Sequence, residues 1–93
     1  MAAIPASIRL EIVTPEKMLV REDVDEVVVP GEEGYLGVLP GHTPLLATLR
    51  GGDLWYRKGQ EKTHLDIAGG FVEVLPDRVT ILAEASAPVA QTS

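Results

Sequence analysis

Glycine and proline interrupt this 93-residue chain at short intervals, with nine glycines and seven prolines. Between them lie apolar runs of strand length, which recur at roughly the 8–12-residue spacing of antiparallel sandwiches and barrels. No run keeps a helical period long enough for an extended helix. We therefore expect an all-β fold in a single domain. The expected architecture is a two-sheet β-sandwich, in the form of a flattened, jelly-roll-like barrel.

Alternation of apolar and polar residues locates the individual strands. Ile8, Leu10 and Ile12 alternate with Arg9 and Glu11, which is the pattern of a half-buried strand. The residues at 45–50 are apolar at most positions and suit either a strand or one helical turn. With a bend at 22–23, the same pattern predicts further strands at 17–21, 24–30, 35–39, 53–57, 63–67, 71–75 and 79–84.

Composition excludes several classes of function. Fourteen acidic residues stand against eight basic ones, and the resulting net charge of −6 argues against nucleic acid as a partner. The absence of cysteine excludes disulfides, thiolate catalysis and Cys-type zinc sites. No stretch approaches the roughly 18–20 apolar residues of a transmembrane helix. We therefore expect any association with a membrane to be made through a protein partner.

The residues that often carry chemistry are too few or too isolated here. His42 follows a glycine in a corner, and the only other histidine, His64, lies within a predicted strand. Catalysis or metal binding would require further partners, so neither is expected. Glu32 and Glu33 are adjacent in a glycine-flanked loop, where carboxylates are usually solvated. The glycine-rich corners lack the GxxxxGK[ST] pattern, so no phosphate site and no cofactor are expected.

Two glycine-bearing corners carry a family resemblance. The segment Pro40–Leu46 reads Pro-Gly-His-Thr-Pro-Leu-Leu, and Ala68–Val74 reads Ala-Gly-Gly-Phe-Val-Glu-Val. The opening Leu10–Pro15 and the closing Val79–Glu84 complete a set of four segments in the same order. Over about residues 8–84, the chain resembles the N-terminal β domain of the ε subunit of bacterial F-type ATP synthase.

The resemblance implies a mechanical function. The ε subunit is a non-catalytic part of the rotor, or central stalk, and it links the γ subunit to the membrane c-ring. It thereby couples ion-driven rotation, usually hydrogen ion transport, to ATP synthesis. A close-packed β-sandwich suits this task because its interior transmits strain. The expected location is peripheral, on the cytoplasmic side of the bacterial inner membrane.

The resemblance also assigns candidate contacts with the c-ring. In the family, the loop that matches Glu32 and Glu33 faces an arginine of the c subunits, so a charge-assisted contact is implied. The enteric-type motif Gly-Ser-Glu-Gly-Glu-Leu-Gly has its second acid where this chain has Tyr35. We expect Glu32 or Glu33 to take over that contact and Tyr35 to pack at its rim. His42 is implied as a further interface residue.

Two residues are candidates for contact with γ. Thr14 follows the first predicted strand, at a turn that lies close to γ in the family. Trp55, the only tryptophan, lies on the polar face of its strand. Its alternative role is local packing against neighbouring strands.

The end of the chain departs from the usual family pattern. The sandwich domain is expected to span residues 1–84, followed by a frayed, flexible tail at 85–93 that is rich in Ala, Pro, Ser and Thr. Members of the family usually continue into two helices that inhibit ATP hydrolysis and, in some, bind ATP. This sequence contains no such segment, so ATP binding and self-inhibition are not expected of it.

Two other functions remain open on the residues alone. The first is a free-standing β-sandwich module that binds a ligand such as a sugar or a peptide. It would need an exposed aromatic platform, and the chain has only one Trp, two Tyr and one Phe. The second is a small cupin-like enzyme, which two histidines do not favour.

Overall fold

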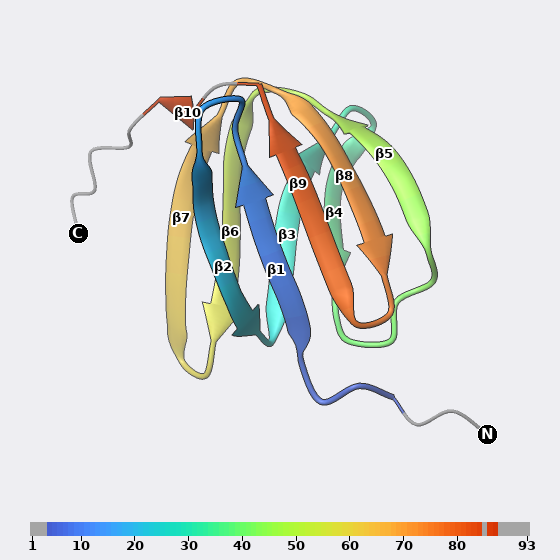
Figure 1. Cartoon of the computed structure of the whole chain (residues 1–93). Helices are drawn as coiled ribbons and strands as arrows, with labels where there is room; N and C mark the ends of the chain where they lie inside the picture. The colour runs from blue at the N-terminus through green and yellow to red at the C-terminus, as the bar shows by residue number, and fades with distance from the viewer. Residues whose placement is uncertain (1–3, 85, 88–93) are drawn as a thin grey trace.

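The computed structural model describes residues 4–84 and 86–87, which form ten β-strands and no helix (Figure 1). The strands are β1 (Ile8–Val13), β2 (Met18–Val24), β3 (Glu26–Gly31), β4 (Gly34–Val38), β5 (Leu45–Leu49), β6 (Gly52–Lys58), β7 (Glu61–Ile67), β8 (Gly70–Leu75), β9 (Arg78–Ala83) and β10 (Ser86–Ala87). The predicted all-β fold in a single domain is therefore confirmed.

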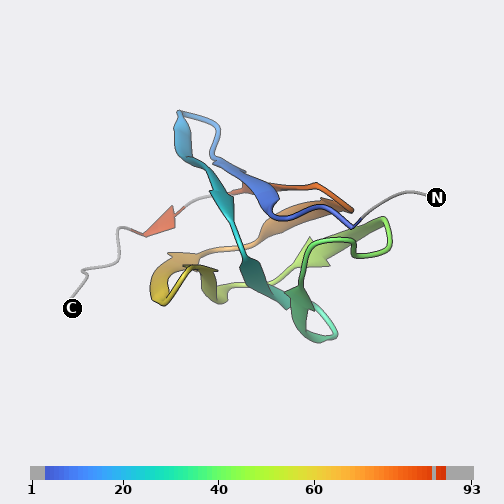
Figure 2. The ribbon, with the colours of Figure 1, turned by 90° about the horizontal axis from the view of Figure 1, so that it is seen from below.

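The strands follow one continuous pairing order, β10-β7-β6-β3-β5-β8-β9-β1-β2, and β4 pairs only with β3. This sheet folds over on itself into two layers, which Figure 2 shows from below. One layer holds β5, β8, β9, β1 and β2, and the other holds β4, β3, β6 and β7. The layers are joined where Leu49 of β5 pairs with Gly31 of β3. Neighbouring strands are antiparallel, except that β1 runs parallel to β9.

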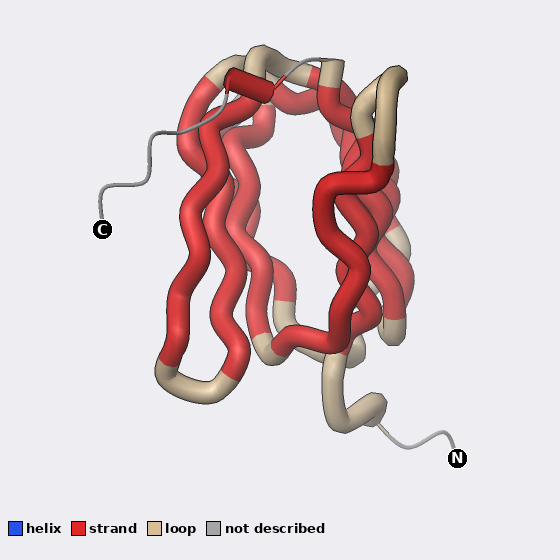
Figure 3. Tube along the Cα trace, turned by 60° about the vertical axis from the view of Figure 1, so that its left-hand side comes forward, coloured by secondary structure: helices blue, strands red, loops and turns tan. Residues whose placement is uncertain are grey.

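The connections lie at the two ends of the sandwich, as the tan segments of Figure 3 show. We call the end at the top of Figure 1 the upper end; it carries the connections at residues 14–17, 32–33, 50–51 and 68–69. The lower end carries the connections at residues 39–44, 59–60 and 76–77.

The core lies between the layers and is built by period-two alternation. Ile8, Leu10 and Ile12 are fully buried, whereas Arg9 and Glu11 point outward. The other layer contributes its own alternate residues. The remaining buried apolar residues are Val24, Val27, Val29, Val38, Leu49, Leu54, Tyr56, Ile67, Val72, Val74, Val79, Ile81 and Ala83. No charged side chain is buried among the described residues.

The bend between β2 and β3 lies at Asp25, so the predicted bend at residues 22–23 is wrong. Asp25 is held by two hydrogen bonds to the β6–β7 hairpin. Its N–H donates to the carbonyl of Arg57 at 2.8 Å, and its carboxylate accepts from the N–H of Gly59 at 2.7 Å. These bonds reach residues far away in sequence, which the local pattern could not indicate.

The structure also decides two open points near β5 and at the chain end. Residues 45–49 form a strand, because Leu45 pairs with Val74 along β8, and no helical turn occurs there. Within the predicted tail, Ser86 and Ala87 pair with Ile67 and Asp66 of β7. Residues 85 and 88–93 lie outside the described residues.

Candidate functional site

Glu32 and Glu33 form the turn of the β3–β4 hairpin at the upper end, and both are exposed. The hairpin is tight because Gly31 and Gly34 flank it: a Cβ on Gly31 would lie 2.8 Å from the carbonyl oxygen of Gly34. The N–H of Glu32 donates to the carbonyl of Thr48 at 3.1 Å, which ties the turn to β5. Two carboxylates are thereby presented on a fixed loop.

Tyr35 lies beside these carboxylates at the start of β4, with 54% of its surface exposed. The guanidinium carbon of Arg50 lies 5.8 Å from the centre of its ring, within the range of a cation–π contact. The N–H of Arg50 also donates to the carbonyl of Pro30 at 2.9 Å, so the residue is anchored on β3. The upper end thus brings together Glu32, Glu33, Tyr35 and Arg50.

His42 lies at the lower end, in the connection between β4 and β5, so the structure does not bring it together with Glu32 and Glu33. Its Nδ1 lies 2.7 Å from the carbonyl oxygen of Thr43, and its N–H donates to the carbonyl of Leu39 at 3.2 Å. These are contacts within its own corner.

Thr14 closes the turn between β1 and β2 at the upper end. Its N–H donates to the carbonyl of Lys17 at 2.9 Å, and its hydroxyl oxygen accepts from the Lys17 N–H at 3.2 Å. The side chain therefore fixes the local turn, as threonine often does.

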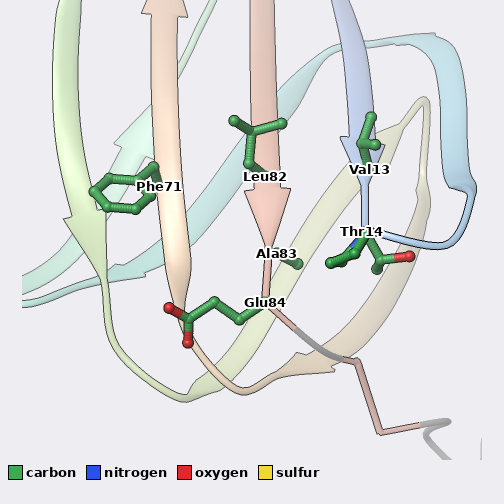
Figure 4. Close-up of a pocket in the computed structure, with 7 residues that line it drawn as sticks. Val13, Thr14, Phe71, Leu82, Ala83 and Glu84 are labelled. Atoms are coloured by element: carbon green, nitrogen blue, oxygen red, sulfur yellow. The ribbon is translucent and has the colours of Figure 1, made fainter.

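Thr14 also borders a shallow apolar hollow that the sequence reading missed (Figure 4). Phe71, Leu82 and Val13 form its floor, and they project from the adjacent strands β8, β9 and β1. Phe71 is 49% exposed and Leu82 is 54% exposed. The parity of each strand could have indicated this face, since Phe71 is on the same side as the exposed Glu73.

Trp55 lies on the outer face of the opposite layer, in the middle of β6. It pairs across the strands with Val28 and His64, and the Lys62 ammonium lies 4.3 Å from the centre of its ring. Nδ1 of His64 lies 3.0 Å from a carboxylate oxygen of Asp53. Trp55 is thus packed within a polar surface, and it shares neither a layer nor an end with Thr14.

The described part of the chain holds no group of three or more His, Asp or Glu residues that could bind a metal ion. Within the same residues, no helix has the length and apolarity needed to cross a bilayer. Among the ionisable groups of the described residues, Tyr56 alone is clearly shifted, and its pKa is raised above its ordinary value. Burial is the largest cause, and the carboxylate of Glu22 adds to it, while a hydrogen bond with Thr63 acts in the opposite direction.

Comparison with known proteins places this sandwich among rotary ATP synthase subunits. The family model "ATP synthase, Delta/Epsilon chain, beta-sandwich domain" matches residues 7–89. The chain is 55% identical over 80 residues to the ATP synthase epsilon chain of Solibacter usitatus, covering 86% of this chain and 60% of that protein. It is 51% identical over 89 residues to the epsilon chain of Granulibacter bethesdensis, covering 95% of this chain and 66% of that protein. The chain thus spans about three-fifths of the length of these curated relatives.

Solved structures agree with this placement. A chain of the Euglena gracilis mitochondrial ATP synthase, in its OSCP/F1/c-ring assembly, matches with a TM-score of 0.89 and 29% identity, over 99% of this chain and 59% of that chain. A chain of the Tetrahymena thermophila mitochondrial ATP synthase central stalk and c-ring matches with a TM-score of 0.74 over 92% of this chain and 73% of that one. At 19% identity, this second likeness concerns the fold alone.

Proposed function

Because this chain belongs to the family of ATP synthase Delta/Epsilon chain β-sandwich domains, we propose that it is a non-catalytic adaptor in the rotor of an F-type ATP synthase. It links γ to the c-ring and couples ion-driven rotation to ATP synthesis. The family match over residues 7–89 carries this proposal. The densely packed core supports it, since a stiff body can transmit torque between two docking surfaces. As part of that complex it is peripheral, on the cytoplasmic side of a bacterial inner membrane.

The c-ring contact is proposed at the upper end. Glu32 and Glu33 are exposed on a short hairpin that β5 holds in place, and Tyr35 lies at the rim beside them. A fixed carboxylate binds a guanidinium more strongly than a neutral acceptor does. His42 lies at the other end, so its proposed contact requires a partner surface that extends along β4 and β5.

The γ contact is proposed on the layer that carries Thr14, whereas Trp55 lies on the opposite layer and is proposed to pack locally beneath Lys62. Neither ATP binding nor self-inhibition is part of the proposed function, and no cofactor is needed for a purely mechanical role.

Binding of the purified chain to purified γ subunit and to purified c-ring tests the function. We expect the double variant Glu32→Lys/Glu33→Lys to weaken c-ring binding by about tenfold, because like charges then face the ring arginine. Glu61→Lys is the matched control, since Glu61 is an exposed glutamate of the β6–β7 hairpin at the lower end.

Equal losses in the double variant and in the control would contradict the ring contact at the upper end. The proposed function requires both contacts, so it would be contradicted if the unmodified chain failed to bind γ or failed to bind the c-ring.

A further inference from the structure

The two layers are not closed on the side where β4 and β5 lie. Among the described residues, β4 pairs with β3 alone, and the ladder between β5 and β3 consists of the single pair Leu49–Gly31. A slot of about 440 Å³ lies between these two edges. The two strands, β4 and β5, are at the right of Figure 1. Its lining residues are Gly31, Glu32, Glu33, Gly34, Leu36, Leu45, Leu46, Ala47 and Thr48.

Both edges of the slot offer unpaired backbone groups. In an antiparallel ladder, the N–H and C=O of alternate residues point toward the paired strand and away from it. Pro30 has no N–H, and its carbonyl accepts from the N–H of Arg50, on the side of β3 that faces away from β4. Pro30 therefore forms no backbone bond with its cross-strand partner Tyr35. Tyr35, and Gly37 two residues further on, thus direct their backbone groups to the free edge of β4. On β5, the carbonyl of Thr48 accepts from the N–H of Glu32, so it points away from β8. Leu46, two residues earlier on the same strand, therefore also directs its backbone groups away from β8 and into the slot. An unpaired edge of this kind accepts an additional strand.

Leucines and an alanine form the apolar part of the slot's lining. Leu36 pairs with the buried Val29 and Leu45 with the buried Val74, so both side chains face inward between the layers. Leu45 is nevertheless 39% exposed, and its neighbour Leu46 is 72% exposed. The slot thus resembles a sandwich core from which one strand is missing.

The upper end of the slot is negatively charged. Glu32 and Glu33 line it, and within the described residues neither carboxylate forms an ion pair. The nearby Arg50 lies against the Tyr35 ring. An occupant with a basic residue at this end would complement the two charges.

We propose that this slot binds an extended segment of another protein by strand addition to β4. The segment hydrogen-bonds to Tyr35 and Gly37, inserts alternate apolar side chains between Leu36 and Leu45, and places a basic residue beside Glu33. Main-chain bonds supply affinity in this mode, and alternate side chains supply specificity. Because β4 runs away from the Glu32–Glu33 turn, an antiparallel segment carries its basic residue at its C-terminal end.

The proposal is tested with the unmodified chain and a blocked synthetic peptide of alternating valine and threonine that ends in arginine. Amide hydrogen exchange is followed residue by residue during titration. We expect exchange at Tyr35 and Gly37 to slow by about tenfold or more at saturation. A peptide with glutamate in place of arginine, and the variant Glu32→Gln/Glu33→Gln, should each weaken binding about two- to tenfold.

Side-chain variants test the location of the slot. Leu45→Glu places a charge inside the slot and should abolish peptide binding. Leu46→Glu is a second variant, and it should keep the fold because the side chain of Leu46 is largely exposed. It should weaken peptide binding several-fold. Leu82→Glu is the control on β9 of the same layer, where a leucine that is 54% exposed lies outside the slot, and it should bind the peptide as the unmodified chain does.

Three results would overturn the proposal. The first is unchanged amide exchange at Tyr35 and Gly37 up to the solubility limit of the peptide, and the second is equal weakening of peptide binding by Leu82→Glu and Leu46→Glu. The third is protection of these amides that rises with protein concentration in the absence of peptide. The last result would assign the slot to a second copy of the chain. These outcomes are independent of binding to γ or to the c-ring, so they are distinguishable from failure of the rotor function.

Discussion

Gly70 illustrates how strongly a single residue is constrained at the corner between β7 and β8. Its φ is +142°, and a Cβ at this position would overlap the carbonyl oxygen of Leu82 on β9. We expect Gly70→Ala to lower the free energy of unfolding by about 3 kcal/mol or more, through steric overlap added to backbone strain. Urea denaturation measures this.

A second glycine provides the matched control for Gly70. Gly59 has a positive φ of +63°, but no atom lies within 4 Å of the position of a Cβ. Gly59→Ala should therefore cost only about 1–2 kcal/mol, the cost of the left-handed backbone alone. Equal losses in the two variants would show that the overlap at Leu82 is relieved at little cost.

Tyr56 couples the stability of the sandwich to alkaline pH. Its pKa is raised by burial, so the folded state keeps the phenol proton at a pH where the unfolded chain has lost it. Its stabilising contribution is therefore complete below pH 10 and declines as the pH rises from 10 through the folded-state pKa. We expect the unmodified chain to lose up to about 1.4 kcal/mol per pH unit in that interval beyond the loss shown by Tyr56→Phe. Denaturation of both proteins from pH 8 to pH 11 measures the difference, and parallel curves would contradict it.

At the scale of strands and hairpins, Arg57 joins three segments at the lower end. Its Nε lies 3.1 Å from Glu26 on β3, and its Nη1 donates to the carbonyl of Gly59 at 2.9 Å and lies 3.9 Å from Asp25. A lysine cannot reproduce these contacts, because they use two nitrogens of a planar group. We expect Arg57→Lys to cost about 1–2 kcal/mol in the free energy of unfolding.

A matched control for Arg57 is Arg78→Lys, at the start of β9. Arg78 is exposed and takes part in no ion pair among the described residues. Thermal unfolding of the two variants compares them directly. An equal change in both would show that the charge of Arg57, rather than its geometry, stabilises the junction.

The strands themselves could be predicted because each obeys a local rule, whereas their partners could not. Alternation located β1, and the Gly-rich corners located the β3–β4 and β7–β8 turns. The break at Asp25 was misplaced because distant hydrogen bonds with Arg57 and Gly59 fix it. The parallel pairing of β1 with β9 and the unpaired edge of β4 also depend on the whole chain.

At the scale of the whole molecule, the candidate residues distribute over two ends and two faces. The sequence motif indicated that Glu32, Glu33 and Tyr35 are neighbours, since they lie in one hairpin. It could not indicate that His42 lies at the opposite end, because the length of β4 separates them. The exposed apolar floor at Phe71 and Leu82 was missed because alternation marks each side chain as outward-facing, but only the pairing of β8 with β9 brings the two together.

The opposite placement of Thr14 and Trp55 yields a prediction about which face meets γ. Exposed apolar surface marks interaction sites, and Thr14 borders the hollow floored by Phe71 and Leu82. Trp55 is partly covered, with Lys62 over its ring. We therefore expect Thr14→Arg and Phe71→Glu each to weaken γ binding by about tenfold or more, because each places a charge in a contact that excludes water.

Trp55→Ala is the informative comparison in the same binding assay. It should leave γ binding within about twofold of the unmodified chain, because the indole packs within its own layer. Retained folding of all three variants is checked by far-ultraviolet circular dichroism. A loss of binding in Trp55→Ala with full binding in Thr14→Arg would place γ on the β6–β7 layer instead.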